Sequence, residues 1–194
     1  GNVKEIRELL ITSVRYSLYL VLPMVLVLVI FGGPIMQLWM GPRYANGVIP
    51  AILAVGSLAI IGQTPLLSIM VGLNAHGRAG MAQFVGSLCS IGLVVLGLKY
   101  LGWGLVGAAV AVTLPLTIMN LTYLPYLICR RVGLNVGRYF WSVTLRPACH
   151  VLPFAVCLLF ARLVLDAQLL KGLAWGAGVG GMILAVVYWR YEIG

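Results

Sequence analysis

Long runs of apolar residues, separated by short polar breaks, dominate this sequence. The run from Tyr16 to Trp39, YSLYLVLPMVLVLVIFGGPIMQLW, contains no charged residue. Because a bilayer core about 30 Å thick is crossed by about 20 apolar residues in one helix, such a run predicts a membrane-spanning helix. Comparable runs recur along the chain, and they are too many and too long for a signal peptide. The pattern predicts an all-α, polytopic transmembrane helix bundle.

The composition agrees with a membrane protein. Hydrophobic residues make up 62% of the 194 positions and charged residues 9%, with a mean hydropathy of +1.06, whereas about a quarter of the residues in soluble domains are charged. The net charge of +9 requires no nucleic acid, because basic residues at helix ends meet the anionic lipids of the inner leaflet.

We expect six spans, two of them with internal breaks. The first break is Gly32-Gly33-Pro34, which predicts a kinked or broken first helix, and the second is Gly62 to Pro65. The expected spans are Tyr16 to Trp39, Val48 to Leu73, Met81 to Leu98, Gly104 to Ile128, Ala148 to Leu165 and Gly172 to Trp189.

These spans divide the chain into three parts. Residues 1–129 hold four transmembrane helices, and residues 148–194 hold a terminal pair. Between them, residues 130–147, RRVGLNVGRYFWSVTLRP, combine four arginines with three aromatic residues. That mixture favours a basic cytoplasmic connector lying at the level of the lipid headgroups.

The distribution of basic residues predicts the orientation, because cytoplasmic loops carry the excess of Lys and Arg. With the amino end inside, the inner set is Lys4, Arg7, Arg78, Arg130, Arg131, Arg138, Arg146 and Arg190. The outer set is the smaller one: Arg43, Lys99, Arg162 and Lys171. The count favours a multi-pass protein of the cytoplasmic (inner) membrane with both ends of this chain in the cytoplasm.

Glycine spacing raises the possibility of a nucleotide site. Gly102, Gly104 and Gly107 match the G-x-G-x-x-G fingerprint, which requires a preceding strand and an acidic residue about 20 positions further on. The chain has only four acids, Glu5, Glu8, Asp166 and Glu192, and none lies there. We therefore interpret these glycines, and Gly172, Gly176 and Gly180 at four-residue spacing, as small-residue surfaces on which helices pack closely.

Residues that could perform catalysis or bind a metal are scarce. The four cysteines show no C-x-x-C spacing, and no Ser-His-Asp set, carboxylate pair or metal-ligand spacing occurs. His150 has no carboxylate or second histidine near it in sequence. The sequence therefore predicts a protein that is not an enzyme and has no cofactor or metal.

Polar residues inside spans are candidate cavity residues, because each costs free energy unless it faces protein or water. Arg15 is either an anchor at the headgroups or a charge facing a cavity. Gln63 and Thr64 precede Pro65, where the broken helix either exposes polar groups to a substrate or forms a kink with local partners. Asn120 is an interhelical hydrogen-bonding residue or, less favoured, a ligand contact.

The break between the second and third spans, GLNAHGRAGMAQF, contains Arg78 and Gln83. One interpretation is a solvated cytoplasmic turn. The alternative is that the guanidinium fork of Arg78, which suits phosphate, binds an anionic headgroup that enters from the inner leaflet.

The order of four motifs resembles that of polysaccharide and O-antigen flippases of the multidrug/oligosaccharidyl-lipid/polysaccharide exporter superfamily. These motifs are IFGGPIMQLWMGPRYANG, GLNAHGRAG, YLGWGLVGAAVAVTL and RYFWSVTLRP. The resemblance covers about residues 3–165. It implies a carboxy-terminal part of such a flippase: four helices of its second lobe and an extra terminal pair, with the amino-terminal lobe as a missing partner.

The resemblance also implies a function. Two lobes would enclose a cavity that opens to one leaflet at a time and passes a polyprenyl-diphosphate-linked oligosaccharide outward for surface polysaccharide biosynthesis, with cationic residues attracting the diphosphate. Three other functions remain open: an ion-coupled multidrug exporter, a membrane glycosyltransferase or ligase, and a non-transporting scaffold subunit. The exporter usually requires a carboxylate within the membrane.

Overall fold

The computed structural model describes residues 3–164 and 169–190, and within these ranges it contains helices and turns but no strand. Helix α4 ends at Lys99, and Tyr100 and Leu101 form a turn before Gly102, so the strand that a dinucleotide fingerprint requires is not found in the described part. The helices are α1 (Val3–Met40), η1 (Pro42–Tyr44), α2 (Val48–Gly62), α3 (Thr64–Gly72), α4 (His76–Lys99), α5 (Gly104–Ile118), η2 (Met119–Tyr123), α6 (Leu124–Val132), α7 (Val136–Phe140), η3 (Trp141–Leu145), α8 (Arg146–Val164) and α9 (Leu169–Tyr188).

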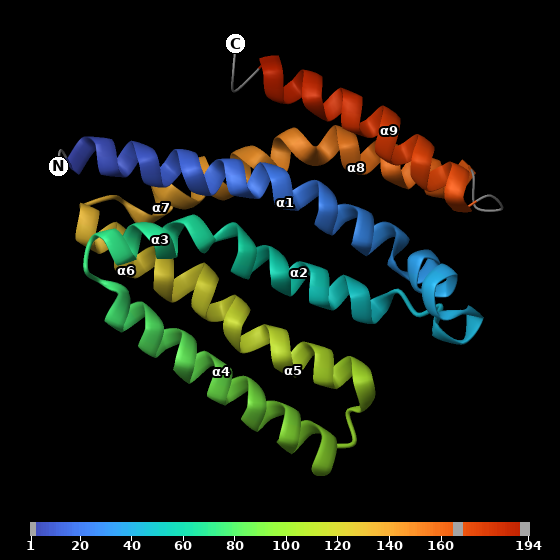
Figure 1. Ribbon diagram of the computed structural model, residues 1–194, viewed down its shortest axis with the longest axis horizontal. Helices are drawn as coiled ribbons and strands as arrows, with labels where there is room; N and C mark the ends of the chain where they lie inside the picture. Colours follow the sequence, from blue (N-terminus) through green and yellow to red (C-terminus); the bar gives the residue numbers. More distant parts are fainter. Residues whose placement is uncertain (1–2, 165–168, 191–194) are drawn as a thin grey trace.

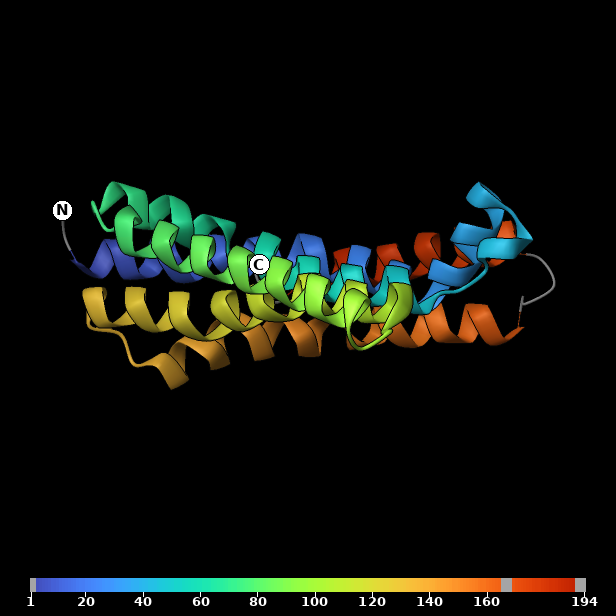
Figure 2. The same cartoon turned by 90° about the horizontal axis from the view of Figure 1, so that it is seen from below.

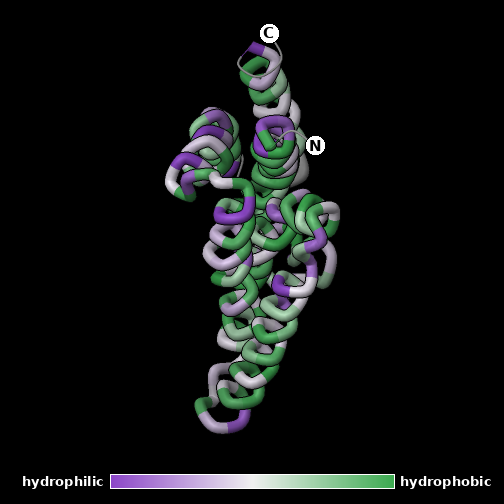
Figure 3. The backbone as a smooth tube through the Cα atoms, turned by 90° about the vertical axis from the view of Figure 1, so that its left-hand side faces the viewer, coloured by the Kyte–Doolittle hydropathy of each residue, from purple (hydrophilic) through white to green (hydrophobic). Residues whose placement is uncertain are grey.

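The helices lie side by side and alternate in direction (Figures 1 and 2). Helix α1 packs against α2, α3, α8 and α9, while α4 and α5 form a pair that joins the bundle through α2. The amino end and the turns α3–α4 and α6–α7 lie at one end of the bundle, on the left in Figure 1. Seen along the helices from that end, the helix bodies are mostly hydrophobic, and hydrophilic residues gather mainly near helix ends (Figure 3).

Five helical segments of the described chain are long and apolar enough to cross a membrane, which identifies a multi-pass membrane protein. They are Val3–Met40, Val48–Gly72, His76–Lys99, Gly104–Val132 and Val136–Val164. The sixth expected span corresponds to α9, of which Ala174–Tyr188 is a shorter apolar helix among the described residues. The predicted all-α bundle is confirmed, with five long spans in the described part instead of six.

Two sequence-based expectations concern the course of the helices. Helix α1 runs from Val3 to Met40 through Gly32-Gly33-Pro34, so it is not broken there, and the alternative of a kink stays a prediction. Residues 130–147, where we expected an interfacial connector, contain the end of α6, which extends to Val132, and the start of the next helical segment at Val136. Their position at the lipid headgroups stays a prediction. The connection is the short turn Gly133–Asn135, and Tyr139 lies fully buried in the protein core.

Two prolines lie within α1, and side chains from the terminal helices bind the carbonyls that they leave without a donor. A proline lacks the N–H that would bond to the carbonyl four residues earlier. Pro23 thus frees the Tyr19 carbonyl, which accepts from the Tyr188 hydroxyl at 3.0 Å, and Pro34 frees the Ile30 carbonyl, which accepts from Arg162. These bonds explain why α1 continues past both prolines.

A related arrangement recurs at two other places. At the break between α2 and α3, Pro65 has no N–H for the Ile61 carbonyl, which accepts instead from the Gln63 main-chain N–H and from the Ser17 hydroxyl at 3.2 Å. In the π-helical turn η3, the Arg146 N–H bonds five residues back to Trp141, so Pro147 leaves the Ser142 carbonyl free. The Nε atom of Arg15 donates to that carbonyl at 3.2 Å.

Small residues allow the helices to approach closely at one of the two places where we expected it, on α9, whereas Gly102 and Gly104 have no atom of another segment within 4 Å of an added Cβ. A Cβ atom on Gly176 would lie 3.0 Å from the Ala161 side chain, and one on Gly180 would lie 2.8 Å from the Phe154 ring. These two glycines therefore form the contact surface of α9 on α8. At the other glycine-rich stretch, a Cβ on Gly107 would lie 2.2 Å from the Trp103 side chain, so that glycine makes room for the indole.

The apolar core is divided into two clusters along the bundle. One lies toward the left-hand end in Figure 1 and joins α1 to α3, α6 and α7. The other lies between the second half of α1 and the helices α8 and α9. Helices α4 and α5 contribute little to either cluster, and many of their apolar side chains are exposed, as expected for surfaces that face lipid.

We predict that Tyr188→Phe lowers the free energy of unfolding by about 0.5–1.5 kcal/mol, because the Tyr19 carbonyl loses its donor while the ring contact is kept. Denaturation of the protein in bicelles measures this cost. In a Pro23→Ala background, where residue 23 again has an N–H for the carbonyl, the same substitution should cost much less. Equal costs in both backgrounds would contradict the explanation.

Candidate functional site

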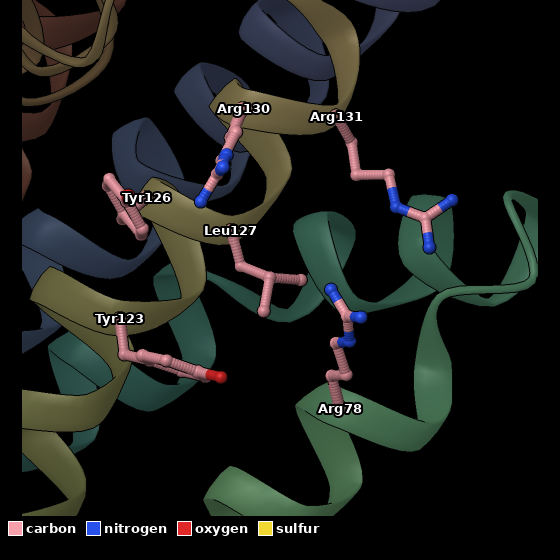
Figure 4. A pocket seen from close by; sticks show the side chains of 6 residues that line it. All are labelled: Arg78, Tyr123, Tyr126, Leu127, Arg130 and Arg131. Carbon is pink, nitrogen blue, oxygen red and sulfur yellow. The ribbon is translucent and has the colours of Figure 1, made fainter.

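A pocket of about 550 Å³ lies between α4 and the segment formed by η2 and α6, toward the end of the bundle that holds the amino terminus. It is lined by Arg78, Tyr123, Tyr126, Leu127, Arg130 and Arg131. Figure 4 shows Arg78 extending from α4 toward the facing helix, with Arg131 on the same side of Leu127 and Arg130 beside Tyr126. Three cationic and two phenolic side chains therefore surround one space.

The sequence places five of these residues on a single helical face. Tyr123, Tyr126, Leu127, Arg130 and Arg131 follow the spacing i, i+3, i+4, i+7 and i+8, which aligns side chains along one side of a helix. The face ends where the chain turns at Gly133, whose φ of 65° is the left-handed conformation that glycine adopts without strain.

The other side of the pocket is the first turn of α4. Arg78 is the third residue of this helix, which begins at His76. The main-chain N–H groups of a first turn have no intrahelical acceptor and carry partial positive charge. This end of α4 therefore adds to the positive potential of the arginines.

The electrostatics of the pocket favour an anion. All three arginines are exposed, and within the described ranges no hydrogen bond or ion pair joins them to another residue. Guanidinium groups gathered around one space repel each other, and a multivalent anion would remove that repulsion. Arginine forks bind phosphate oxygens in a bidentate manner, and phenolic hydroxyls can donate to the same oxygens.

Of the six candidate residues from the sequence, only Arg78 lines this pocket. Gln83 and Asn120 lie next to it and bind each other: Gln83 Nε2 donates to Asn120 Oδ1 at 3.0 Å. Asn120 is fully buried, and its Nδ2 donates to the Leu116 carbonyl at 2.8 Å. The structure thus gives Asn120 an interhelical hydrogen bond.

Gln63 and Thr64 lie at the break between α2 and α3, but they have different surroundings. The Gln63 side chain is buried and accepts a hydrogen bond from the Tyr139 hydroxyl at 3.0 Å. Thr64 is exposed and donates back to the Ile60 carbonyl at 3.3 Å. Gln63 therefore links the break to α7, whereas Thr64 has a local partner.

Arg15 is half-buried on α1 and donates to a carbonyl of η3. It does not line the arginine pocket. This contact was not among the interpretations that we drew from sequence, which were a headgroup anchor and a cavity charge. The six candidates consequently occupy three separate places: the pocket and its border, the break at Gln63, and the contact between α1 and η3.

Sequence reasoning did not identify the other five pocket residues, Leu127 among them. We had assigned Arg130 and Arg131 to a connector and had not considered Tyr123 and Tyr126. The five-residue helical face was a signal that could have identified them. Two acids discussed above, Asp166 and Glu192, lie outside the described residues.

Comparisons with protein-family models, curated proteins and solved structures found no match for this chain.

The Gln63–Tyr139 hydrogen bond should contribute more to the free energy of unfolding than an average hydrogen bond, because both groups are buried. We predict that Tyr139→Phe lowers the free energy of unfolding by about 1–3 kcal/mol, since the Gln63 Oε1 atom loses its donor. Adding Gln63→Leu should recover part of this loss. Bicelle unfolding checks both variants, with exposed Tyr126→Phe as the control. A Tyr139→Phe protein as stable as that control would refute the prediction.

Proposed function

We propose that this chain is part of a flippase that moves a polyprenyl-diphosphate-linked oligosaccharide across the cytoplasmic membrane. The observation that carries the proposal is the arginine pocket, which lies beside the lipid-facing helices α4 and α5 of a multi-pass bundle. A ligand that has an anionic head and a long apolar tail fits this combination. The order of the four sequence motifs gives independent support.

The pocket would act on the diphosphate. Arg78, Arg130 and Arg131 would neutralise its charges, and Tyr123 and Tyr126 would donate hydrogen bonds to its oxygens. The polyprenyl tail would stay in lipid along the exposed apolar faces of α4 and α5, and the glycan would extend into water. Because the pocket opens between two helices, the head can enter sideways from a leaflet.

Movement of the ligand to the other leaflet would require alternating access between this lobe and a second one. The break between α2 and α3 at Gln63 supports such motion, because two short helices can change their relative angle more easily than one continuous helix. The second lobe, which would complete the cavity, is itself proposed.

The proposal predicts that each pocket arginine contributes to ligand affinity. A hydrogen bond to a charged group is worth about 1.5–3 kcal/mol, so Arg78→Ala or Arg131→Ala should weaken binding of a polyprenyl diphosphate by about tenfold or more. The affinity is measured on the purified chain in nanodiscs. In the host, Arg78→Ala should slow glycan export with little loss of protein.

The matched control is Arg138→Ala, which removes an exposed arginine from α7 that does not line the pocket. It should leave both affinity and export nearly unchanged. Equal losses for Arg138→Ala and Arg78→Ala would indicate a general effect of positive charge and would refute a specific site. Unchanged lipid-linked glycan after deletion of the gene would refute the flippase function.

The proposal also predicts that the pocket end of the bundle faces the cytoplasm. In a protein whose four cysteines are replaced, a cysteine at exposed His76 should react with a membrane-impermeant maleimide only after the cells are opened. A cysteine at exposed Ala45, between η1 and α2, should react in intact cells. The reverse pattern would invert the orientation and place the pocket in the outer leaflet.

A further inference from the structure

Helix α4 is held against α5 and η2 by a series of close contacts that ends beside the arginine pocket. Ser90 donates to the Val112 carbonyl at 3.1 Å. One turn nearer the pocket, a Cβ on Gly86 would lie 3.2 Å from the Leu116 side chain, so the helices almost touch. The next contact is the Gln83–Asn120 hydrogen bond of 3.0 Å. Beyond it, the large side chains that line the pocket begin.

Asn120 lies at the point where α5 changes to the π-helical turn η2. The Leu124 N–H bonds five residues back to the Met119 carbonyl, and the following Pro125 has no N–H to continue a regular pattern. The Asn120 side chain donates to the Leu116 carbonyl, one turn earlier in the same helical segment. Its oxygen accepts from Gln83 on α4.

The π-turn determines which side of the following helix faces α4. A π-turn inserts one extra residue, and each residue of an α-helix corresponds to a rotation of about 100°. Without it, the face that carries Arg130 and Arg131 would point away from Arg78. A side-chain pair that stabilises this turn and ties it to α4 therefore controls the geometry of the pocket.

We propose that Gln83 and Asn120 are positioning residues that fix the separation between Arg78 and the arginine pair of α6. They make the pocket selective for an anion with two linked phosphates over one with a single phosphate. This inference rests on the proposed function, because it assumes that the arginine pocket binds phosphate groups. A diphosphate contacts Arg78 on one side and the arginine pair of α6 on the other, so its affinity depends on the distance between them. A single phosphate can bind to one of these groups alone, so its affinity does not depend on that distance.

The test compares two probes, inorganic pyrophosphate and inorganic orthophosphate, on the full chain in nanodiscs of zwitterionic lipid. Isothermal titration calorimetry gives both affinities for the wild type, Gln83→Ala, Asn120→Ala and the exchange Gln83→Asn/Asn120→Gln. We expect each alanine variant to lose about tenfold in pyrophosphate affinity and to bind orthophosphate nearly as the wild type does. The exchange, which keeps both amides, should restore part of the pyrophosphate affinity.

The matched control is Ser87→Ala. Ser87 lies one turn after Gln83 on α4, is exposed and bonds only to the Gln83 carbonyl of its own helix. It should leave both affinities unchanged. If Gln83→Ala weakens the two anions equally, the pair merely supports helix packing, and the positioning role is overturned.

A second measurement needs no ligand. Spin labels at Gly77→Cys and Arg131→Cys, in a protein without its native cysteines, report the distance between α4 and α6 by pulsed electron resonance. We expect one narrow distribution, which Gln83→Ala broadens or shifts; an unchanged distribution would refute the positioning role. If the wild type binds neither anion but Gln83→Ala still changes the distance between the two labels, the phosphate site is refuted and the positioning role remains supported.

Discussion

The satisfaction of main-chain carbonyls in an apolar environment is the constraint on which this structure depends. In lipid, a carbonyl without a donor costs several kcal/mol, and prolines within spanning helices create such carbonyls. Side chains from neighbouring helices bind three of these carbonyls: Tyr188, Arg162 and Arg15 donate to those freed by Pro23, Pro34 and Pro147. At Pro65, Ser17 adds a second donor to the Ile61 carbonyl. Each bond also ties two helices together, so the prolines help to determine the packing.

This constraint distinguishes two sets of three arginines. Arg7, Arg15 and Arg162 donate to main-chain carbonyls of other helices. The pocket arginines are different: no hydrogen bond or ion pair connects Arg78, Arg130 or Arg131 to the rest of the described chain. A cationic group inside or beside a membrane is costly unless it is partnered. The second group therefore has binding capacity for a ligand, and their clustering favours a multivalent anion.

The pocket depends on features that lie outside it. Gly86 and Ser90 allow α4 to approach α5 closely, the Gln83–Asn120 bond is the last tie before the pocket, and η2 rotates the arginine face of α6 toward α4. Binding would therefore respond to substitutions that touch no ligand. The buried Gln63–Tyr139 bond is a comparable link, because it joins the break between α2 and α3 to α7.

The sequence by itself determined the class of protein, the number of long spans to within one and most of their positions, because the length and period of apolar runs are local properties. It also identified Arg78 and the break at Gln63. Only the tertiary structure decided that α1 continues past Pro34, that Tyr139 is buried and that Arg130 and Arg131 line one pocket with Arg78. These outcomes depend on donors and helix faces brought together from distant parts of the chain, and on a π-turn whose extra residue leaves no periodic mark in the sequence.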